Sequence, residues 1–231
     1  MPIECARLIC NENGIPVSEL YKDVYHSASG GHAQARHVFL EGNKLPVRWQ
    51  GRQTFTILET GFGLGINFLA TWLAWTNDPQ RCKELHFISV EKHPFELSDM
   101  QIAYQSWPEF SFLSEELLLL WPKAEEGEYV LEVSKGAVFL RLILGDALKY
   151  LSELAAKVDA FYLDGFAPEK NPELWSDDLC KSLAQLAAKG ATLATWSVAG
   201  SVRQALMHAG FSVQKTPGFA EKKEMLIGYF P

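Results

Sequence analysis

The residues with the clearest capacity for chemistry lie in the stretch "ETGFGLGIN", residues 59–67. An apolar run ends at Glu59, glycines follow at Gly61, Gly63 and Gly65, and a helix-like pattern then begins. Glycine tolerates positive φ and lets a ligand approach the main chain closely. A strand, a glycine turn and a helix N-terminus together form a cradle for a nucleotide-like cofactor. The stretch therefore predicts a cofactor site.

The spacing of the glycines bears on which cofactor this is. A nicotinamide fingerprint reads G-x-G-x-x-G, but Ile66 stands where its third glycine would be. The spacing G-x-G-x-G, with an acid two residues before the first glycine, resembles motif I of class I methyltransferases, which use S-adenosyl-L-methionine. A nicotinamide enzyme and a plain strand-to-helix turn remain alternatives, because short glycine motifs also occur by chance.

Acidic residues end two further apolar segments. Glu91 ends "ELHFISVE" and is followed by Lys92, and Asp146 is followed by Ala147 after "FLRLILG". Ligands of open α/β sheets bind at the carboxyl ends of the strands. We therefore expect Glu91 to accept hydrogen bonds from the ribose hydroxyls of a bound nucleoside. Asp146 should accept a hydrogen bond from the amino group of its adenine. The alternative for each is a capping or surface acid.

Asp164 ends a fourth apolar segment, "VDAFYLD", and leads directly into "GFAPEKNP". An acid followed here by Phe166 and Pro168 resembles the Asp/Asn-Pro-Pro-aromatic motif of amine methyltransferases, in which the polar residue holds the acceptor amine and the aromatic ring stacks on it. The alternative is an aspartate that only forms the turn. Four strand ends that agree are less expected by chance than any one of them.

These residues need a framework of alternating strands and helices. Strands are expected at 54–60, 84–92, 158–166, 190–197, 211–217 and 223–230, with helices between the earlier ones. A hairpin is expected within 129–147, and its second arm should be a core strand. Such alternation predicts a parallel sheet covered by helices. The last two strands have no helix between them, so the chain should end in an antiparallel hairpin. The expected fold is thus α/β, a Rossmann-like class I methyltransferase sheet with an antiparallel C-terminal strand.

The chain should divide into an N-terminal extension, residues 1–53, and a methyltransferase domain, residues 54–231. The extension reads as irregular, with one hairpin around Asn13 and Gly14 and loop signals around a short apolar piece at 38–40. Its histidines, His26, His32 and His37, do not have the spacing of a helical metal-ligand pair, so no metal site is expected.

Composition limits the class of protein further. The chain has 231 residues, 48% of them hydrophobic, and a net charge of −7. A disordered chain and a generally basic nucleic-acid-coating protein are both disfavoured. Its four cysteines form no C-x-x-C pair, which is most simply explained by reduced thiols in a cytoplasmic protein. No apolar run is long enough to span a membrane.

Longer stretches carry a family resemblance, namely "VYHS", "HVFLEGNKLPVRW", "ETGFGLGINFLATW", "LHFISVEKHP", "VDAFYLDGFAPEKNPELW", "GATLATWS" and "KKEMLIG". From about residue 14 to about residue 230, the chain resembles the methyltransferase domain of the MnmC family, the tRNA 5-methylaminomethyl-2-thiouridine biosynthesis proteins. The resemblance implies methyl transfer from S-adenosyl-L-methionine to the 5-aminomethyl group of the wobble uridine of tRNA. It also implies a flavin-dependent oxidase as a fused or separate partner.

The resemblance assigns roles to matching positions. Glu59, the three glycines and Asn67 would line the methionine end of the cofactor, with Glu91 and Lys92 at its ribose and Asp146 and Ala147 at its adenine. Asp164 would hold the acceptor amine, first by orienting it and second by accepting its proton. Glu41 and Asn43 would help close the pocket. The acceptor side would comprise Phe166, Pro168, Lys170, Lys222 and Lys223.

An acidic protein that binds tRNA needs a local basic rim. We expect this rim at Lys170, Arg203, Lys222 and Lys223, with Arg36, Lys44 and Arg48 as the alternative surface. Two rival functions also remain open. One is a methyltransferase or aminopropyltransferase that acts on a small amine, and the other is a binding module that keeps the cofactor cradle without catalysis.

Overall fold

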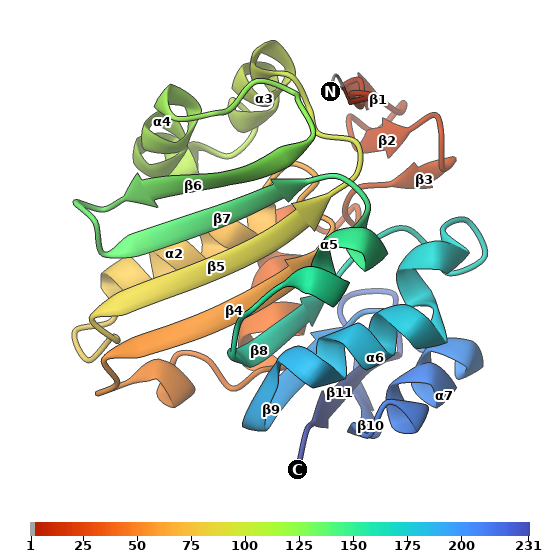
Figure 1. Ribbon diagram of the computed structural model, residues 1–231. Helices are drawn as coiled ribbons and strands as arrows, with labels where there is room; N and C mark the ends of the chain where they lie inside the picture. The colour runs from red at the N-terminus through yellow and green to blue at the C-terminus, as the bar shows by residue number, and fades with distance from the viewer. Residues whose placement is uncertain (1–2) are drawn as a thin grey trace.

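The computed structural model describes residues 3–231 and has an eight-stranded sheet at its centre (Figure 1). From one edge to the other, the strands are β10 (Ser212–Pro217), β11 (Glu224–Tyr229), β9 (Ala187–Thr195), β8 (Val158–Leu163), β4 (Thr54–Thr60), β5 (Glu84–Glu91), β7 (Val138–Leu144) and β6 (Gly127–Val133).

The middle of this sheet is parallel. β4 pairs with β5 on one side and with β8 on the other, β5 pairs with β7, and β8 pairs with β9, all in parallel. β11 runs antiparallel to both β9 and β10, and β6 runs antiparallel to β7. The predicted α/β sheet, its C-terminal hairpin and the hairpin within 129–147 are therefore confirmed.

Two hydrophobic cores cover the two faces of the sheet. Successive strand residues point to opposite faces, so Ile57 of β4 lies in one core and Leu58 lies in the other. The helices α5 (Ala147–Glu153), α6 (Asp177–Leu186) and α7 (Gly200–His208) pack on one face (Figure 1). The opposite face carries α2 (Ile66–Asn77), α3 (Leu97–Tyr104), η3 (Pro108–Phe110) and α4 (Ser111–Leu119).

The N-terminal segment begins with a small three-stranded sheet of β1 (Ile9–Cys10), β2 (Pro16–Ser18) and β3 (Asp23–Val24). β1 and β2 pair antiparallel, so the predicted hairpin around Asn13 and Gly14 is confirmed. The expectation that the rest is irregular is wrong, because α1 (Gly31–Gln34), the π-helical η1 (Ala35–Glu41) and η2 (Val47–Trp49) follow. Flanking glycines and prolines signal loops, but burial of Val38 and Phe39 against the sheet stabilises a helical turn there.

In the described part of the chain, no helix is both long enough and apolar enough to cross a membrane.

Candidate functional site

The carboxyl ends of the central parallel strands meet at one edge of the sheet, and the turns that follow them are tied together. After β4, the backbone N–H of Gly61 donates to the carbonyl of Val90 at 2.8 Å. The hydroxyl of Thr60 donates to the carbonyl of Asp164 at 2.8 Å, which joins the turn after β4 to the turn after β8. This edge therefore brings the predicted residues of three strands into one region.

The glycine turn has the backbone that its sequence predicts. Gly61, Gly63 and Gly65 have φ values of 81°, 52° and 68°, a region in which a side chain is strained. A Cβ at Gly63 would lie 3.3 Å from the ring of Tyr25, and one at Gly61 would lie 3.3 Å from the carbonyl of Asp164. Gly65 precedes the first residue of α2. The bare backbone thus leaves room between the sheet and the N-terminal segment.

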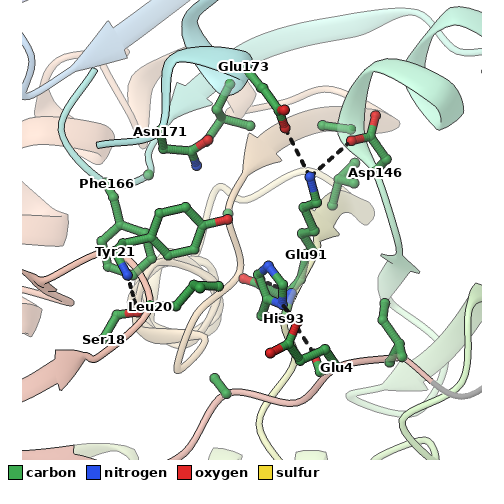
Figure 2. Close-up of a pocket in the computed structure, with 18 of the residues that line it drawn as sticks. Glu4, Ser18, Leu20, Tyr21, Glu91, His93, Asp146, Phe166, Asn171 and Glu173 are labelled. Carbon is green, nitrogen blue, oxygen red and sulfur yellow. Dashed lines mark hydrogen bonds and ion pairs between the residues drawn. The ribbon is translucent and has the colours of Figure 1, made fainter. Parts of the chain in front are cut away.

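A cavity of about 1240 Å³ opens beside this turn, and Figure 2 shows its lining. Glu91, at the end of β5, accepts hydrogen bonds from the backbone N–H groups of Gly63 at 2.7 Å and of His93 at 2.8 Å. Each carboxylate oxygen has a further lone pair, so Glu91 can still accept the two hydroxyls of a ribose. The hydrogen bond from Gly63 therefore fixes Glu91 relative to the glycine turn.

An ion-pair cluster crosses this cavity. Lys92 lies 2.9 Å from a carboxylate oxygen of Glu173 and 3.4 Å from one of Asp146. Dashed lines end at the labelled Glu173 and Asp146 in Figure 2. The hydrogen bond to Glu173 is the largest cause that raises the pKa of Lys92. The other oxygen of Asp146 caps α5 by accepting from the N–H of Lys149 at 3.2 Å. Asp146, Ala147 and Lys92 therefore line one cavity, with Asp146 already engaged on both oxygens.

Aromatic rings from the N-terminal segment cover the same region. Tyr21 stacks on Phe166, with ring centroids 4.6 Å apart, and Tyr25 meets Phe166 edge-on at 5.1 Å. Figure 2 shows the rings of Tyr21 and Phe166 side by side at the cavity wall. One face of Phe166 is thus covered by Tyr21, so that face is closed to an acceptor ring.

A second cavity of about 390 Å³ is lined by Gly61 and Gly63 of the glycine turn and by Asp164. One oxygen of Asp164 accepts from the side-chain amide of Asn67 at 2.8 Å. The other accepts from the N–H of Gly165 at 2.8 Å and from the indole N–H of Trp196 at 3.1 Å. Three neutral donors from three elements therefore fix the direction of this carboxylate.

Asn67 links Asp164 to a second, fully buried carboxylate. The same amide nitrogen donates to Glu59 at 2.9 Å, and the hydroxyl of Ser89 donates to the other oxygen of Glu59 at 2.6 Å. Burial raises the pKa of Glu59 well above its ordinary range. Because Asn67 uses both amide hydrogens on carboxylates, its carbonyl oxygen is left as an acceptor at the cavity.

Burial also raises the pKa of Asp164, to about 6, against the opposing effect of its hydrogen-bond donors. At neutral pH the group is mostly ionised, yet it lies close enough to its pKa to gain a proton. Such a carboxylate can orient an amine and can take its proton.

The two cavities share Tyr25, Gly61, Glu91, Gly165 and Phe166 in their linings. An elongated ligand can therefore extend from Asp146, past Glu91 and the glycine turn, to Asp164. This arrangement fits a nucleoside with a chain on its ribose, whose far end meets a second molecule at Asp164.

Some predicted residues lie away from both cavities. Asn43 is fully buried, donates to the carbonyls of Phe39 at 2.9 Å and Phe161 at 3.2 Å, and accepts from Thr192 at 2.6 Å. The expectation that it closes the pocket is wrong, because it joins η1 to the sheet. Glu41 also lines neither cavity, and its exposed carboxylate pairs with Arg36 and His37.

Of the remaining predicted residues, some line a cavity and others do not. Glu59 lies beneath Asn67 and lines neither cavity, and Pro168, Lys170, Arg203 and Lys223 line neither as well. The ammonium of Lys170 is engaged by Asp23 at 3.4 Å and by the carbonyl of Lys22. Lys222 lines the smaller cavity, where its ammonium lies 3.7 Å from the centre of the Trp196 ring.

Sequence reasoning missed Trp196, Tyr21, Tyr25 and Glu173. Trp196 directly follows β9, so its place at the carboxyl end of a parallel strand is the sequence signal that points to it. Tyr21 and Tyr25 lie in the segment that was read as irregular, where no periodic signal indicates which side chains face the site.

Among residues 3–231, no group of three or more histidine, cysteine, aspartate or glutamate side chains is placed to hold a metal ion. The imidazoles of His32 and His37 lie instead beside the carboxylates of Glu109 and Glu41.

Comparison with known proteins adds a family and two relatives. A family model of S-adenosyl-L-methionine-dependent methyltransferases matches residues 108–231. A tRNA 5-methylaminomethyl-2-thiouridine biosynthesis bifunctional protein MnmC from Azoarcus sp. is 54% identical over 100% of this chain and 36% of its own length. The protein of the same name from Paraburkholderia phytofirmans is 53% identical over 99% of this chain and 35% of its own length. The chain thus spans about a third of the length of these relatives.

A solved structure supports the fold. The crystal structure of MnmC2 from Aquifex aeolicus matches with a TM-score of 0.76 and 24% identity, over 97% of this chain and 70% of that chain. At this identity, the likeness bears on the fold alone.

Proposed function

The chain belongs to the family of S-adenosyl-L-methionine-dependent methyltransferases, and on that premise we propose that it methylates the 5-aminomethyl group of the wobble uridine in tRNA. The product would be 5-methylaminomethyluridine or its 2-thio form. Family membership confirms the predicted methyltransferase class and its cofactor. The acceptor is our inference from relatives more than half identical over the whole chain and from the site.

The observation that carries the proposal is the position of Asp164 at the end of the smaller cavity. Its carboxylate is directed by Asn67, Gly165 and Trp196 and lies next to the glycine turn. An amine that enters this cavity would meet a hydrogen-bond acceptor on one side and the cofactor region on the other.

The residues present fit the cofactor. A glycine turn in which a Cβ would meet Tyr25 and a carboxylate with free lone pairs at Glu91 suit a ribose and a chain that passes close to the backbone. Asp146 and Ala147 would hold the adenine, Glu91 the ribose, and Gly61, Gly63 and Asn67 the methionine end. When bound, S-adenosyl-L-methionine supplies an electrophilic methyl group on its sulfonium.

Asp164 and its partners would do the positioning. Methyl transfer forms a nitrogen–carbon bond while the carbon–sulfur bond breaks, the electron pair of the broken bond stays on sulfur as a thioether, and nitrogen loses one proton. Holding the amine in line can supply about 7–11 kcal/mol of the barrier lowering. Asp164 accepts one N–H of the amine and so directs its lone pair, and it takes the proton directly or through water as the nitrogen becomes cationic.

The aromatic cover would exclude water from the transfer. Tyr25 and Phe166 line both cavities, and Tyr21 lines the larger one and stacks on Phe166. Excluding water strengthens the electrostatic contacts made inside the site. Because Tyr21 already covers one face of Phe166, an acceptor ring would have to approach the other face.

The basic rim is narrower than the sequence suggests. Lys170 is engaged by Asp23. Lys222 lines the smaller cavity, and Lys223 follows it in the closing loop, residues 218–223 between β10 and β11. We assign tRNA docking to this closing loop. The function would place the protein in the cytoplasm with its tRNA substrate. A flavin-dependent oxidase, fused or separate, would be its partner, and the bifunctional name and greater length of the relatives support that assignment.

The proposal is tested by incubating the protein with labelled S-adenosyl-L-methionine and tRNA that carries 5-aminomethyluridine, followed by nucleoside analysis. We expect label in 5-methylaminomethyluridine. The matched control is tRNA with an unmodified wobble uridine, which has no amine. Label in small amines but not in tRNA would support the alternative, a small-amine methyltransferase, and aminopropyl products would indicate an aminopropyltransferase.

A further inference from the structure

The charges that line the smaller cavity are unbalanced. Five carboxylates line it, and Lys222 is the single lysine or arginine among its lining residues. The acids are Asp23, Glu91, Asp164, Glu221 and Glu224, and the other titratable lining residues are Tyr25 and His26. Glu59 lies beneath, behind Asn67.

Two of these acids have cations of their own. Asp23 pairs with Lys170 at 3.4 Å, and Glu224 pairs with Lys215 at 2.7 Å. Among residues 3–231, no lysine, arginine or histidine lies within salt-bridge distance of Asp164 or Glu91, which are held by neutral donors. The end of the cavity where the amine would bind is therefore negative apart from Lys222.

Lys222 is held in a defined place there. Its ammonium lies 3.7 Å from the centre of the Trp196 ring, and the indole N–H of the same ring donates to Asp164 at 3.1 Å. A cation over an indole face is attracted by the ring quadrupole. Partial burial lowers the pKa of Lys222, while Asp23, Glu169 and Asp164 oppose the shift. Trp196 thus fixes Lys222 on one side and Asp164 on the other.

A negative site would hinder the proposed reaction. Carboxylates favour the ammonium form of a bound amine, which has no lone pair with which to attack. An alkylamine with a pKa of about 10 is already mostly protonated at neutral pH. Something at the site has to offset this tendency.

Resting on the proposed function, we propose that the Lys222 ammonium keeps the acceptor amine neutral by disfavouring a second positive charge beside Asp164. Lys222 acts on the protonation state of the amine through its charge and makes no bond to the reacting atoms. A neighbouring unit charge that is partly screened by solvent shifts the pKa of an amine by about one unit. The nitrogen lone pair is then available to form the nitrogen–carbon bond.

The test compares Lys222→Met, Lys222→Arg and Lys189→Met. Methionine keeps most of the length of the side chain without its charge, and arginine keeps the charge. Lys189 is the matched control because it is an exposed lysine near the start of β9, away from Trp196, and lines neither cavity. The rate of single-turnover methyl transfer, with tRNA and cofactor saturating, is measured against pH for each protein.

In Lys222→Met, we expect the apparent pKa of the rising limb to increase by about one unit, which is about tenfold in rate below that pKa. Lys222→Arg should restore the wild-type profile, and Lys189→Met should not move it. A lysine that only docks tRNA would change the KM for tRNA and leave the pH profile in place, and that result would overturn the inference.

A second measurement does not depend on turnover. The pKa of the aminomethyl group of 5-aminomethyluridine, labelled at nitrogen, is followed by NMR on the protein saturated with S-adenosylhomocysteine. We expect it to be higher in Lys222→Met than in wild type, and equal values would overturn the inference. A wild-type protein that neither binds this nucleoside nor methylates tRNA would instead contradict the proposed function.

Discussion

At Asp164, two opposing influences act on one carboxylate. Burial raises its pKa to about 6, while Asn67, Gly165 and Trp196 donate hydrogen bonds that stabilise the charge. The balance leaves a group that is mostly ionised at neutral pH and can still accept a proton. This supports a role that begins with orienting the amine and ends with taking its proton.

Replacing Asp164 by alanine should separate binding from catalysis. The cofactor cradle lies mainly on the glycine turn and Glu91, so Asp164→Ala should keep most of its affinity for S-adenosyl-L-methionine. Turnover should fall by roughly 100-fold or more, the scale for loss of an acid–base group. Calorimetry gives the first value and methyl transfer to tRNA the second. Wild-type turnover would return Asp164 to the role of a turn residue.

The raised pKa of Asp164 also predicts how stability depends on pH. Its pKa is about 6 when folded and about 3.9 in an unfolded chain. Between these values the folded protein binds more protons, so ionisation of Asp164 lowers stability as pH rises through this window.

Asp164→Ala removes this penalty. We expect the variant to gain about 1–2 kcal/mol of unfolding free energy relative to wild type between about pH 4.5 and about pH 7.5, after allowing for solvent screening. Urea unfolding at both pH values measures the difference. Glu59 is present in both proteins and largely cancels. A constant difference would show that the carboxylate is solvated like that of a surface aspartate.

The glycine turn is the element on which cofactor binding depends. Gly63 combines a φ of 52° with only 3.3 Å between its would-be Cβ and Tyr25. Gly63→Val should therefore weaken binding of S-adenosyl-L-methionine by roughly 100-fold, because strain of about 1–3 kcal/mol and displacement of Tyr25 act together.

Gly51→Val is the control for this change. Gly51 has a φ of 70°, and nothing lies within 4 Å of its would-be Cβ, so it carries the backbone strain without the contact. Calorimetry should show near-wild-type affinity for this variant. If both variants lost cofactor affinity equally, the loss would come from impaired folding. The glycine turn would then not be part of the cofactor site.

The loop between β10 and β11 is the element proposed to dock tRNA. Changing Lys222 and Lys223 together to glutamate should weaken tRNA binding, while cofactor affinity remains unchanged. Each lost phosphate contact should flatten the plot of log affinity against log salt by about 0.7 to 0.9. Filter binding across salt concentrations measures both. Unchanged affinity and slope would direct attention to Arg36 and Lys44, because Arg48 is bonded to the backbone of Asp159 and Gly190.

At the scale of the whole molecule, the N-terminal segment and the sheet share one core. Phe39 of η1 is fully buried and stacks on Tyr162 of β8, with centroids 5.2 Å apart. We propose that residues 1–53 and 54–231 unfold together, although their sequences differ in regularity.

Phe39→Ala tests this coupling. Loss of a buried phenylalanine costs about 3–5 kcal/mol, and the variant should still unfold in one transition by tryptophan fluorescence and by circular dichroism. Val47→Ala, at a side chain that is 71% exposed, should change stability by less than about 0.5 kcal/mol. Two separate transitions would show that the extension is an independent unit.

Local sequence signals suffice to predict the parallel sheet, its C-terminal hairpin, the glycine turn and the methyltransferase class. Each of these rests on a local signal: hydrophobic period, turn chemistry, or a long run of family-specific residues. The same signals placed Asp164, Glu91 and Asp146 at strand ends, and parallel strands bring such ends to one edge.

Which side chains meet at that edge depends on how distant segments of the chain pack together. Asn43 lies in a motif typical of the family, yet it is buried against Phe161 and Thr192. Trp196 lies in the stretch "GATLATWS", from which no site role is predicted, yet it holds Asp164 and lies under Lys222. Tyr21 and Tyr25 reach the site from a segment without periodicity. A contact between residues far apart in the chain depends on packing geometry, and the hydrophobic period of a single segment carries no information about its partner.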